Sequence, residues 1–401
     1  MTTLLRGGRL LDERGERSSG QQSERGERSS GGQRSAGGAR EGSSGAWVLL
    51  DGDAIAATGT DAAPAATEIV DLGDATLVPG FVDLHVHGGG GHAVDDGGAE
   101  LEAALAAHRA HGTTRSLVSL VANPLAEVRE RLAEIAGLAA RDPRVLGAHL
   151  EGPFLAPARR GAHEEAFLKH PDPETVEGLL EAGGGVLRQV TIAPELPGAM
   201  DAIARLSAAG IVAAVGHTEA DEATTRAAFD AGARMLTHAF NAMPGIHHRA
   251  PGPVVAAIDD PRITIELILD GMHVHPHVAR LLWDAAPGRV ALITDAMAAA
   301  AEADGDYRLG ILNVSVRDGV ALLSGTQTIA GSTLTQDVAL RQALAMGVTP
   351  AAAIAALTTV PARAMAEERI GLLEPGYAAD VVALDGSWHV TDVWAAGQRV
   401  G

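Results

Sequence analysis

The chain has 401 residues, no cysteine, 46% hydrophobic residues and a formal net charge of −20. Without cysteine there is no disulfide framework and no thiolate chemistry, and the strong negative charge argues against nucleic acid as a partner. No apolar run approaches the roughly 20 residues that cross a bilayer, and residues 1–11 lack the apolar core of a secretory signal, so we expect a cytoplasmic protein without a membrane partner.

Short β-prone runs, broken by Gly and Asp, occur at both ends of the chain. Because chain termini often meet in space, we predict a small β-sandwich domain built from residues 1–79 and 367–401. Within it, residues 13–45 contain the motif ERGERSSG twice and almost no apolar side chain. Burial in such a stretch cannot offset the entropy lost on ordering. We therefore predict a disordered low-complexity insertion there, within a hairpin.

The middle of the chain alternates between two patterns. Helical spacing of apolar residues occurs over 99–112, 124–140, 199–210 and 221–232. Eight apolar runs of strand length lie before, between and after such segments: 81–87, 113–121, 145–151, 186–193, 211–217, 234–241, 263–270 and 290–295. Strands that are apolar throughout and alternate with helices are typical of a parallel sheet covered by helices. Eight repeats predict an α/β protein with a closed (β/α)₈ TIM-type barrel over residues 80–366.

Polar residues stand at or just after the carboxyl ends of most of these runs, where barrel enzymes place their active sites. They are His85, His87, Glu151, Glu195, His217, His238, Asn241, His273 and Asp295. His85 and His87 are two residues apart, so both project to one face of a strand, and four glycines follow them. Any one of these residues could be an ordinary strand-end side chain, but their meeting around one mouth indicates a site.

Glu151, His217 and His238 combine a carboxylate with two imidazoles, a set that Zn²⁺ or Fe²⁺ accepts. Such a set leaves a coordination position for water, and a bound divalent ion lowers the pKa of that water from 15.7 to about 7. Asp295, on the eighth strand, can take the proton of the water and later deliver it to a leaving amine. The residues therefore predict a metal-dependent hydrolytic site.

The motifs FVDLHVHG, HLEGPF, APE, GHT, THAFNAMP, HHRAPG, DGMHV, TDAM and AGSTLT, spread over about residues 70 to 385, resemble the N-acetylglucosamine-6-phosphate deacetylase family of the amidohydrolase superfamily. Many binuclear members of the superfamily bridge two metals with a carbamylated lysine on the fourth strand. This chain has one lysine, Lys169, in a helical stretch. Glu151 is expected to supply the bridging carboxylate instead.

The resemblance implies hydrolysis of the N-acetyl group of N-acetyl-D-glucosamine 6-phosphate by a metal-bound hydroxide, in amino-sugar catabolism or recycling. It implies metal ligation by Glu151, His217 and His238, general acid/base catalysis by Asp295, and one or two divalent ions (Zn, Fe or Mn) per subunit. His85 and His87 suit a second ion, and we rank two ions above one. The four glycines would let their loop pass close to the site or the sugar.

The resemblance also implies a set of substrate contacts. They are His163, Asn241, Ala242, Arg249, His273, Ile329, Ala330 and Gly331. Arg249 and His273 resemble the phosphate-binding residues, which in the family come from the adjacent subunit, so we expect a homodimer. Arginine suits phosphate because its guanidinium is planar and always charged.

Three alternatives remain open at this point. N-acetylgalactosamine 6-phosphate differs from the first substrate in the orientation of one hydroxyl, which the sequence does not distinguish. A nucleobase deaminase shares the barrel but would leave the phosphate-site resemblance and HLEGPF unexplained. A non-catalytic scaffold would be expected to lose metal ligands, whereas this chain keeps all three and the eighth-strand Asp.

Overall fold

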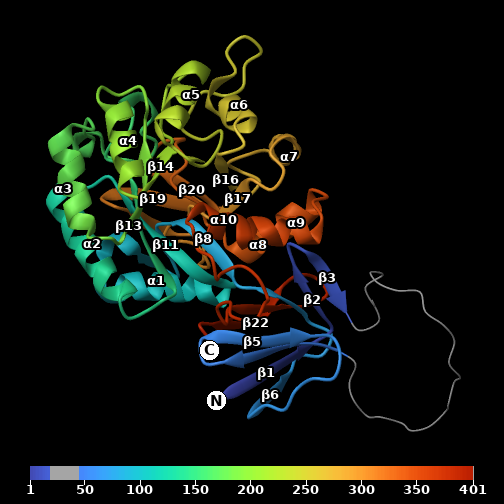
Figure 1. The fold of residues 1–401 in the computed structure, drawn as a ribbon. Helices are drawn as coiled ribbons and strands as arrows, with labels where there is room; N and C mark the ends of the chain where they lie inside the picture. Colours follow the sequence, from blue (N-terminus) through green and yellow to red (C-terminus); the bar gives the residue numbers. More distant parts are fainter. Residues whose placement is uncertain (19–44, 401) are drawn as a thin grey trace, which may run out of the picture.

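The computed structural model describes residues 1–18 and 45–400 and contains the predicted barrel (Figure 1). Eight parallel strands pair in chain order in one sheet. The last and first strands meet through a parallel bridge between Val86 and Ala296, which closes the barrel. The strands are β8 (Phe81–Val86), β11 (Thr113–Val121), β12 (Val145–Glu151), β13 (Leu187–Ile192), β14 (Val212–Val215), β15 (Met235–Leu236), β16 (Thr264–Ile268) and β17 (Val290–Ile293).

Helices surround this sheet because each has one apolar stripe to bury. In α2 the buried residues Val128, Leu132, Ile135 and Leu138 follow helical spacing, and the side chains of Asp172 and Asp221 cap α3 and α5. None of the helices in the described part of the chain combines the length and apolarity needed to span a bilayer. The helices are α1 (Gly98–Ala110), α2 (Leu125–Ala139), α3 (Pro173–Gly183), α4 (Ala199–Ala208), α5 (Glu222–Ala231), α6 (Gly252–Asp259), α7 (Pro276–Ala285), α8 (Gln336–Ala345), α9 (Pro350–Leu357) and α10 (Thr359–Ala364), with short 3₁₀ turns η1 (Val94–Asp96), η2 (Pro157–Arg159) and η3 (Glu165–Phe167).

Strands from both ends of the chain share one sheet, as predicted, and the two termini lie near each other in Figure 1. Leu10, Leu77, Val381 and Trp394 belong to the apolar core shared by these sheets. One sheet has the order β5-β4-β1-β6 and the other β23-β22-β21-β7-β2-β3. Their bounds are β1 (Thr2–Gly7), β2 (Arg9–Asp12), β3 (Gly15–Ser18), β4 (Ala46–Asp51), β5 (Ala54–Gly59), β6 (Glu68–Asp71), β7 (Thr76–Pro79), β21 (Val381–Leu384), β22 (Val390–Ala395) and β23 (Gln398–Arg399).

The prediction of a disordered insertion over 13–45 is wrong for its first residues. Gly15–Ser18 forms β3, which pairs antiparallel with β2, and Arg17 lies 2.9 Å from the buried carboxylate of Asp12. This ion pair and the strand pairing order a segment that lacks apolar residues. Residues 19–44 lie outside the described residues, and the division of the chain into domains at 79/80 and 366/367 stays a prediction.

A three-stranded antiparallel sheet between the eighth barrel strand and α8 was not predicted. It consists of β18 (Asp306–Leu309), β19 (Leu312–Arg317) and β20 (Val320–Leu323). Its buried residues Val314, Val316 and Ala321 form a separate core with Met297 and Ala330. This core holds the segment around residues 327–331 beside the mouth of the barrel.

The four glycines after His87 help to close the barrel. Gly88–Gly89 forms β9, which pairs with β10 (His92–Ala93). The amides of Gly90 and Gly91 donate to the carbonyls of Ala300 and Ala298, each at 2.8 Å. None of these four glycines, Gly88 to Gly91, lines the main pocket. We expected this loop to pass close to the site or the sugar. Instead it packs against residues 298–300, which follow β17.

Gly88→Ala is expected to lower the free energy of unfolding by about 1–3 kcal/mol, because a forced methyl group in a packed region displaces its neighbours. A Cβ at Gly88 would lie 2.6 Å from the carbonyl oxygen of His92 and 2.7 Å from the amide of Ala298, both backbone atoms. Urea denaturation measures the change. Gly137→Ala in α2 is the matched control: its Cβ meets nothing within 4 Å, so this variant should gain roughly 0.5–1 kcal/mol. Equal effects of the two variants would contradict the packing role.

Candidate metal centre and substrate pocket

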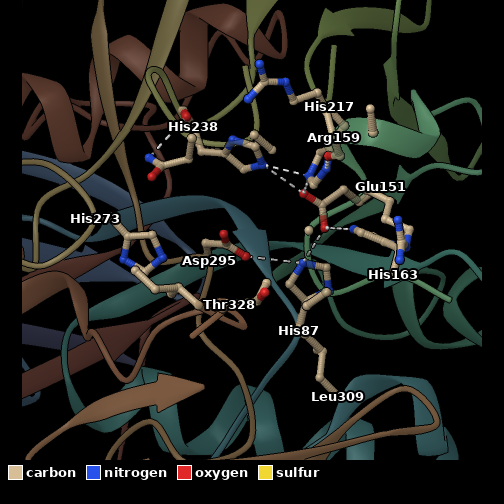
Figure 2. Close-up of a pocket in the computed structure, with 18 of the residues that line it drawn as sticks. His87, Glu151, Arg159, His163, His217, His238, His273, Asp295, Leu309 and Thr328 are labelled. Atoms are coloured by element: carbon tan, nitrogen blue, oxygen red, sulfur yellow. Dashed lines mark hydrogen bonds and ion pairs between the residues drawn. The ribbon is translucent and has the colours of Figure 1, made fainter. Parts of the chain in front are cut away.

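A cavity of about 530 Å³ opens at the carboxyl ends of the barrel strands (Figure 2). Most of the residues predicted for the site line this one cavity. They are His87, Glu151, His163, His217, His238, Asn241, Ala242, His273, Asp295, Ile329 and Gly331. Residues from the ends of separate strands thus lie around one cavity, and their roles stay predictions.

Glu151 lies at the centre of the cluster. Its Oε1 is 3.0 Å from Nε2 of both His217 and His238, and the two Nε2 atoms are themselves 3.0 Å apart. Figure 2 shows the three side chains pointing toward one another. Three potential ligand atoms from the ends of β12, β14 and β15 thus converge on one point.

The histidine pair of β8 forms a second group around the same carboxylate. The Nε2 atoms of His85 and His87 are 3.0 Å apart, and His87 Nε2 is 3.2 Å from Glu151 Oε2. Oδ1 of Asp295 lies 3.5 Å from His85 Nε2 and 3.4 Å from His87 Nε2. His85 is fully buried and does not line the cavity. Glu151 is therefore shared between two groups of ligand atoms.

Three of these residues adopt backbone conformations that L-residues rarely take. His217, His238 and Asp295 have φ values of 47°, 25° and 49°. Left-handed backbone costs a non-glycine residue on the order of 1–2 kcal/mol, and such strain clusters at functional sites. Each is the second residue after the end of its strand, where this backbone conformation leaves the side chain in the cluster.

The orientation of the His217 ring suits metal binding. Its Nδ1 donates to the carbonyl oxygen of Arg159 at 2.8 Å, so the lone pair of Nε2 faces Glu151. Metal-binding histidines are commonly fixed in this way by a backbone carbonyl. The convergent carboxylates and imidazoles, all nearly inaccessible to solvent, therefore fit a divalent metal.

The histidines also determine the charge of the two carboxylates. Burial alone would raise the pKa of Glu151, but His85, His163 and His217 outweigh it and hold that pKa well below its ordinary value. Burial is likewise outweighed at Asp295, where His85 and His87 lower the pKa to about 2. Both side chains are ionised at neutral pH.

His273 corrects one expectation. We expected the phosphate ligands to come from an adjacent subunit, but His273 lines the pocket of its own chain. Its Nδ1 lies 2.6 Å from Asp270 Oδ2, and the same carboxylate accepts from the amide of Met272, so the short loop after β16 folds back over the mouth. Burial would lower the pKa of His273, yet Asp270 outweighs burial and raises it.

Two other predicted contacts do not reach the cavity. Ala330 is fully buried in the core under β18–β20, while its neighbours on both sides line the pocket. Arg249 is exposed on the loop before α6 and lines no part of the pocket in this chain. Gln327, Thr328, Ile329 and Gly331 all line the pocket, whereas Ala330 packs in the core that contains Met297.

The structure adds pocket residues that the sequence analysis missed. They are Ala158, Arg159, Arg160, Gly161, Ala162, Leu309, Gln327 and Thr328. One signal was present: two adjacent arginines stand just before His163, in a chain with a net charge of −20. Their cationic side chains make this wall of the cavity suitable for an anion.

Comparison with known proteins agrees with this geometry. The family model described as "Amidohydrolase family" matches residues 76–400. An N-acetylgalactosamine-6-phosphate deacetylase of Escherichia coli O157:H7 is 40% identical over 328 residues, which are 80% of this chain and 87% of that protein. An N-acetylglucosamine-6-phosphate deacetylase of Bos taurus is 37% identical over 353 residues, covering 84% of this chain and 86% of that one.

A solved structure extends the likeness to three dimensions. It is a mutant N-acetyl-D-glucosamine-6-phosphate deacetylase of Mycobacterium smegmatis in complex with N-acetyl-D-glucosamine-6-phosphate. It is 41% identical, has a TM-score of 0.89, and the match covers 100% of this chain and 99% of that one. The resemblance drawn from the motifs is confirmed, and the chain belongs to the amidohydrolase family.

Proposed function

We propose that this protein hydrolyses the N-acetyl group of N-acetyl-D-glucosamine 6-phosphate to give D-glucosamine 6-phosphate and acetate. The observation that carries the proposal is the convergence of Glu151, His217 and His238 within 3.0 Å, beside Asp295 and in a pocket that has Arg159 and Arg160 on one wall. Its relatives act on, or bind, phosphorylated N-acetyl amino sugars.

The metal ligands follow from the two groups around Glu151. Glu151, His217 and His238 would hold the first ion, and His85 and His87, with Glu151 and Asp295, would hold a second. Imidazole and carboxylate ligands suit Zn²⁺, Fe²⁺ or Mn²⁺. When bound, such an ion lowers the pKa of a bound water and polarises a carbonyl oxygen.

Asp295 is the group that moves protons. Its carboxylate lies in the pocket wall beside His87, is ionised, and can accept a proton from the attacking water at an Oδ atom. The same group then gives that proton to the amide nitrogen as the C–N bond breaks, so the amine leaves neutral. Acetate and the amino sugar are the products.

The remaining pocket residues bind and orient the sugar phosphate. His163 and Asn241 supply polar atoms for the sugar, with Ala242, Ile329 and Gly331 against it. Nδ1 of His273 is occupied by Asp270, which leaves Nε2 to donate to a phosphate oxygen. Arg159 and Arg160 offer further donors of the kind that phosphate prefers.

We further propose a homodimer in which Arg249 reaches the pocket of the second copy. Exposed apolar side chains gather on the connections after β15 and β16: Ile246, Met272, Val278 and Leu281. Both connections leave the carboxyl ends of adjacent parallel strands. They therefore lie at the same end of the barrel as Arg249 and His273, which belong to them. Leu281, on α7, is 71% exposed. Exposure of this apolar side chain to water does not stabilise a monomer.

Leu281→Asp is expected to convert the dimer to a monomer, because a charge at the centre of an apolar interface loses its hydration on association. Light scattering coupled to size-exclusion chromatography measures the molar mass. Ile311→Asp, at another exposed apolar residue on the β18–β19 turn, is the control and should keep the mass of the unmodified protein. A monomeric unmodified protein would overturn the homodimer.

Arg249→Ala is expected to raise KM for the phosphorylated sugar by about 10–100-fold, since a hydrogen bond to a charged group contributes roughly 1.5–3 kcal/mol. Activity toward N-acetylglucosamine without phosphate should change little. The matched control is Arg141→Ala, an exposed arginine after α2, which should behave as the unmodified protein. Equal effects on the phosphorylated and unphosphorylated sugars would remove Arg249 from the phosphate site.

Acetate release tests the function directly. The protein, loaded in turn with Zn²⁺, Fe²⁺ and Mn²⁺, is expected to release acetate from N-acetylglucosamine 6-phosphate with a higher kcat/KM than from the unphosphorylated sugar. N-acetylgalactosamine 6-phosphate is the second candidate, because a relative of that activity is 40% identical. The ratio of kcat/KM for the two epimers decides between them, and no release from either would overturn both.

A scaffold without catalysis is disfavoured because the ligand cluster is complete. A nucleobase deaminase is disfavoured by the deacetylase relatives. A cytoplasmic location and the lack of nucleic-acid and membrane partners stay predictions.

A further inference from the structure

A buried carboxylate lies behind the second group of metal ligands. Glu266, on β16, is fully inaccessible to solvent. Its Oε2 is 3.5 Å from Nδ1 of His85. This is the side of the imidazole ring opposite Nε2, which faces Glu151 and Asp295. Glu266 therefore approaches the ring from behind and cannot bind the ion that Nε2 binds.

The two facing atoms have no other partner. Oε2 of Glu266 and Nδ1 of His85 both lack a hydrogen bond within the part of the chain that the structure describes. The other oxygen of Glu266, Oε1, accepts from Nε2 of Gln189 at 2.9 Å. Gln189 is also fully buried. The amide thus holds one end of the carboxylate and leaves the other end beside His85.

A buried carboxylate oxygen without a hydrogen bond is costly in the interior, so the position of Glu266 Oε2 needs a reason. The buried apolar residues around Glu266, from Ile263 to Leu269, offer no polar contact that would stabilise its carboxylate. A histidine ligand commonly donates its second N–H to a carboxylate, which fixes the tautomer and strengthens the ligand. His85 and Glu266 bring the same two groups together, with Nδ1 and Oε2 3.5 Å apart and no hydrogen bond yet formed between them.

We infer that Glu266 is a positioning residue that fixes His85 with its proton on Nδ1 and its Nε2 free to bind a second metal ion. The inference rests on the proposed function and deepens its two-ion site. The first site is built differently: His217 donates Nδ1–H to a neutral backbone carbonyl, that of Arg159. A negative charge behind His85 increases the donor strength of the second site, whereas the first site does not depend on it.

Glu266→Gln tests the inference because it keeps the size of the side chain and removes its charge. Equilibrium dialysis of metal-free protein against Co²⁺ gives the number of ions per chain and the two Kd values. We expect the Kd of the second ion to rise roughly 10–100-fold and that of the first ion to stay within about twofold of the unmodified protein. Glu266→Asp keeps a shortened carboxylate and should raise the second Kd less.

Asp380→Asn is the control for general damage to the barrel. Asp380 is a buried carboxylate paired with Arg115 at 2.6 Å, and both lie outside the pocket. This variant should lower the Tm of the metal-free protein and leave both Kd values unchanged. If Glu266→Gln weakens both ions equally, or leaves the second Kd unchanged, Glu266 has no positioning role. The Glu266→Asp variant decides in the same way if the Gln variant does not fold.

The proposed function can fail separately. If the unmodified protein binds one ion per chain and still releases acetate, the role of Glu266 is overturned and the deacetylase activity stands. If it binds two ions with the expected dependence on Glu266 but releases no acetate, the activity is overturned and the role of Glu266 stands.

Discussion

Asp295→Asn is expected to lower kcat for N-acetylglucosamine 6-phosphate by about 10²–10⁴-fold, the range typical of a lost general acid/base. Asparagine has nearly the same size but cannot accept the proton of the attacking water. It also tolerates the left-handed backbone that residue 295 adopts, with φ of 49°. The loss should therefore come from chemistry and not from misfolding.

The metal content separates this explanation from loss of the site. Glu151, His217 and His238 do not need Asp295, so the first ion should remain in Asp295→Asn. The second ion should bind more weakly, because Asp295 Oδ1 lies within 3.5 Å of His85 and His87 Nε2. Mass spectrometry of bound metal, measured beside kcat, reports both. Asp221→Asn, at the N-cap of α5 where Asn caps as well as Asp, is the control. A kcat within threefold of the unmodified protein would overturn the role of Asp295.

The barrel could be predicted because its strands are buried on both sides and therefore apolar throughout. β11 and β12 match the expected ranges 113–121 and 145–151. The sixth strand does not: we expected 234–241, and only Met235–Leu236 pairs. His238, Phe240 and Ala242 have positive φ, which ends the strand early. Function at the strand end overrides the apolar pattern there.

The small sheet beside the pocket could not be predicted with the same reasoning. Over 306–323 the buried side chains alternate, as in Val314 and Val316, and this pattern does not reveal what covers them. These side chains pack against Met297 and its neighbours, which follow the end of β17. Such a contact depends on tertiary structure, because residues distant in the sequence complete the core.

The same distinction applies to the site. Ligand candidates at strand ends could be predicted because the carboxyl ends of parallel strands meet at one mouth. Arg159 and Arg160 come from a turn after β12, whose path no periodicity determines. The only sign of Glu266 in the sequence is an acidic residue within an apolar strand. Its role depends on the His85 ring that it faces, which the sequence does not reveal.

Glu151→Gln is expected to have the largest effect, because this carboxylate belongs to both groups of ligands. Its two oxygens lie 3.0–3.2 Å from Nε2 of His87, His163, His217 and His238. Glutamine loses the negative charge and turns an N–H₂ group toward one set of imidazoles. Neither ion should bind at micromolar concentration, and acetate release should fall to the level of the metal-free protein.

Thermal unfolding gives a readout that does not depend on activity. A ligand that binds only the folded state stabilises it by about 2.7 kcal/mol when its concentration is 100 times Kd, so Zn²⁺ should raise the Tm of the unmodified protein. It should not raise that of Glu151→Gln. Glu195→Gln is the matched control, because Glu195 also follows a barrel strand but lies outside the pocket, where it accepts from Thr218 and the amide of Glu219. This control should keep the Zn²⁺-dependent rise. A rise of equal size in Glu151→Gln would show that the ion is held elsewhere, and the arrangement of ligands around Glu151 would then not be the metal site.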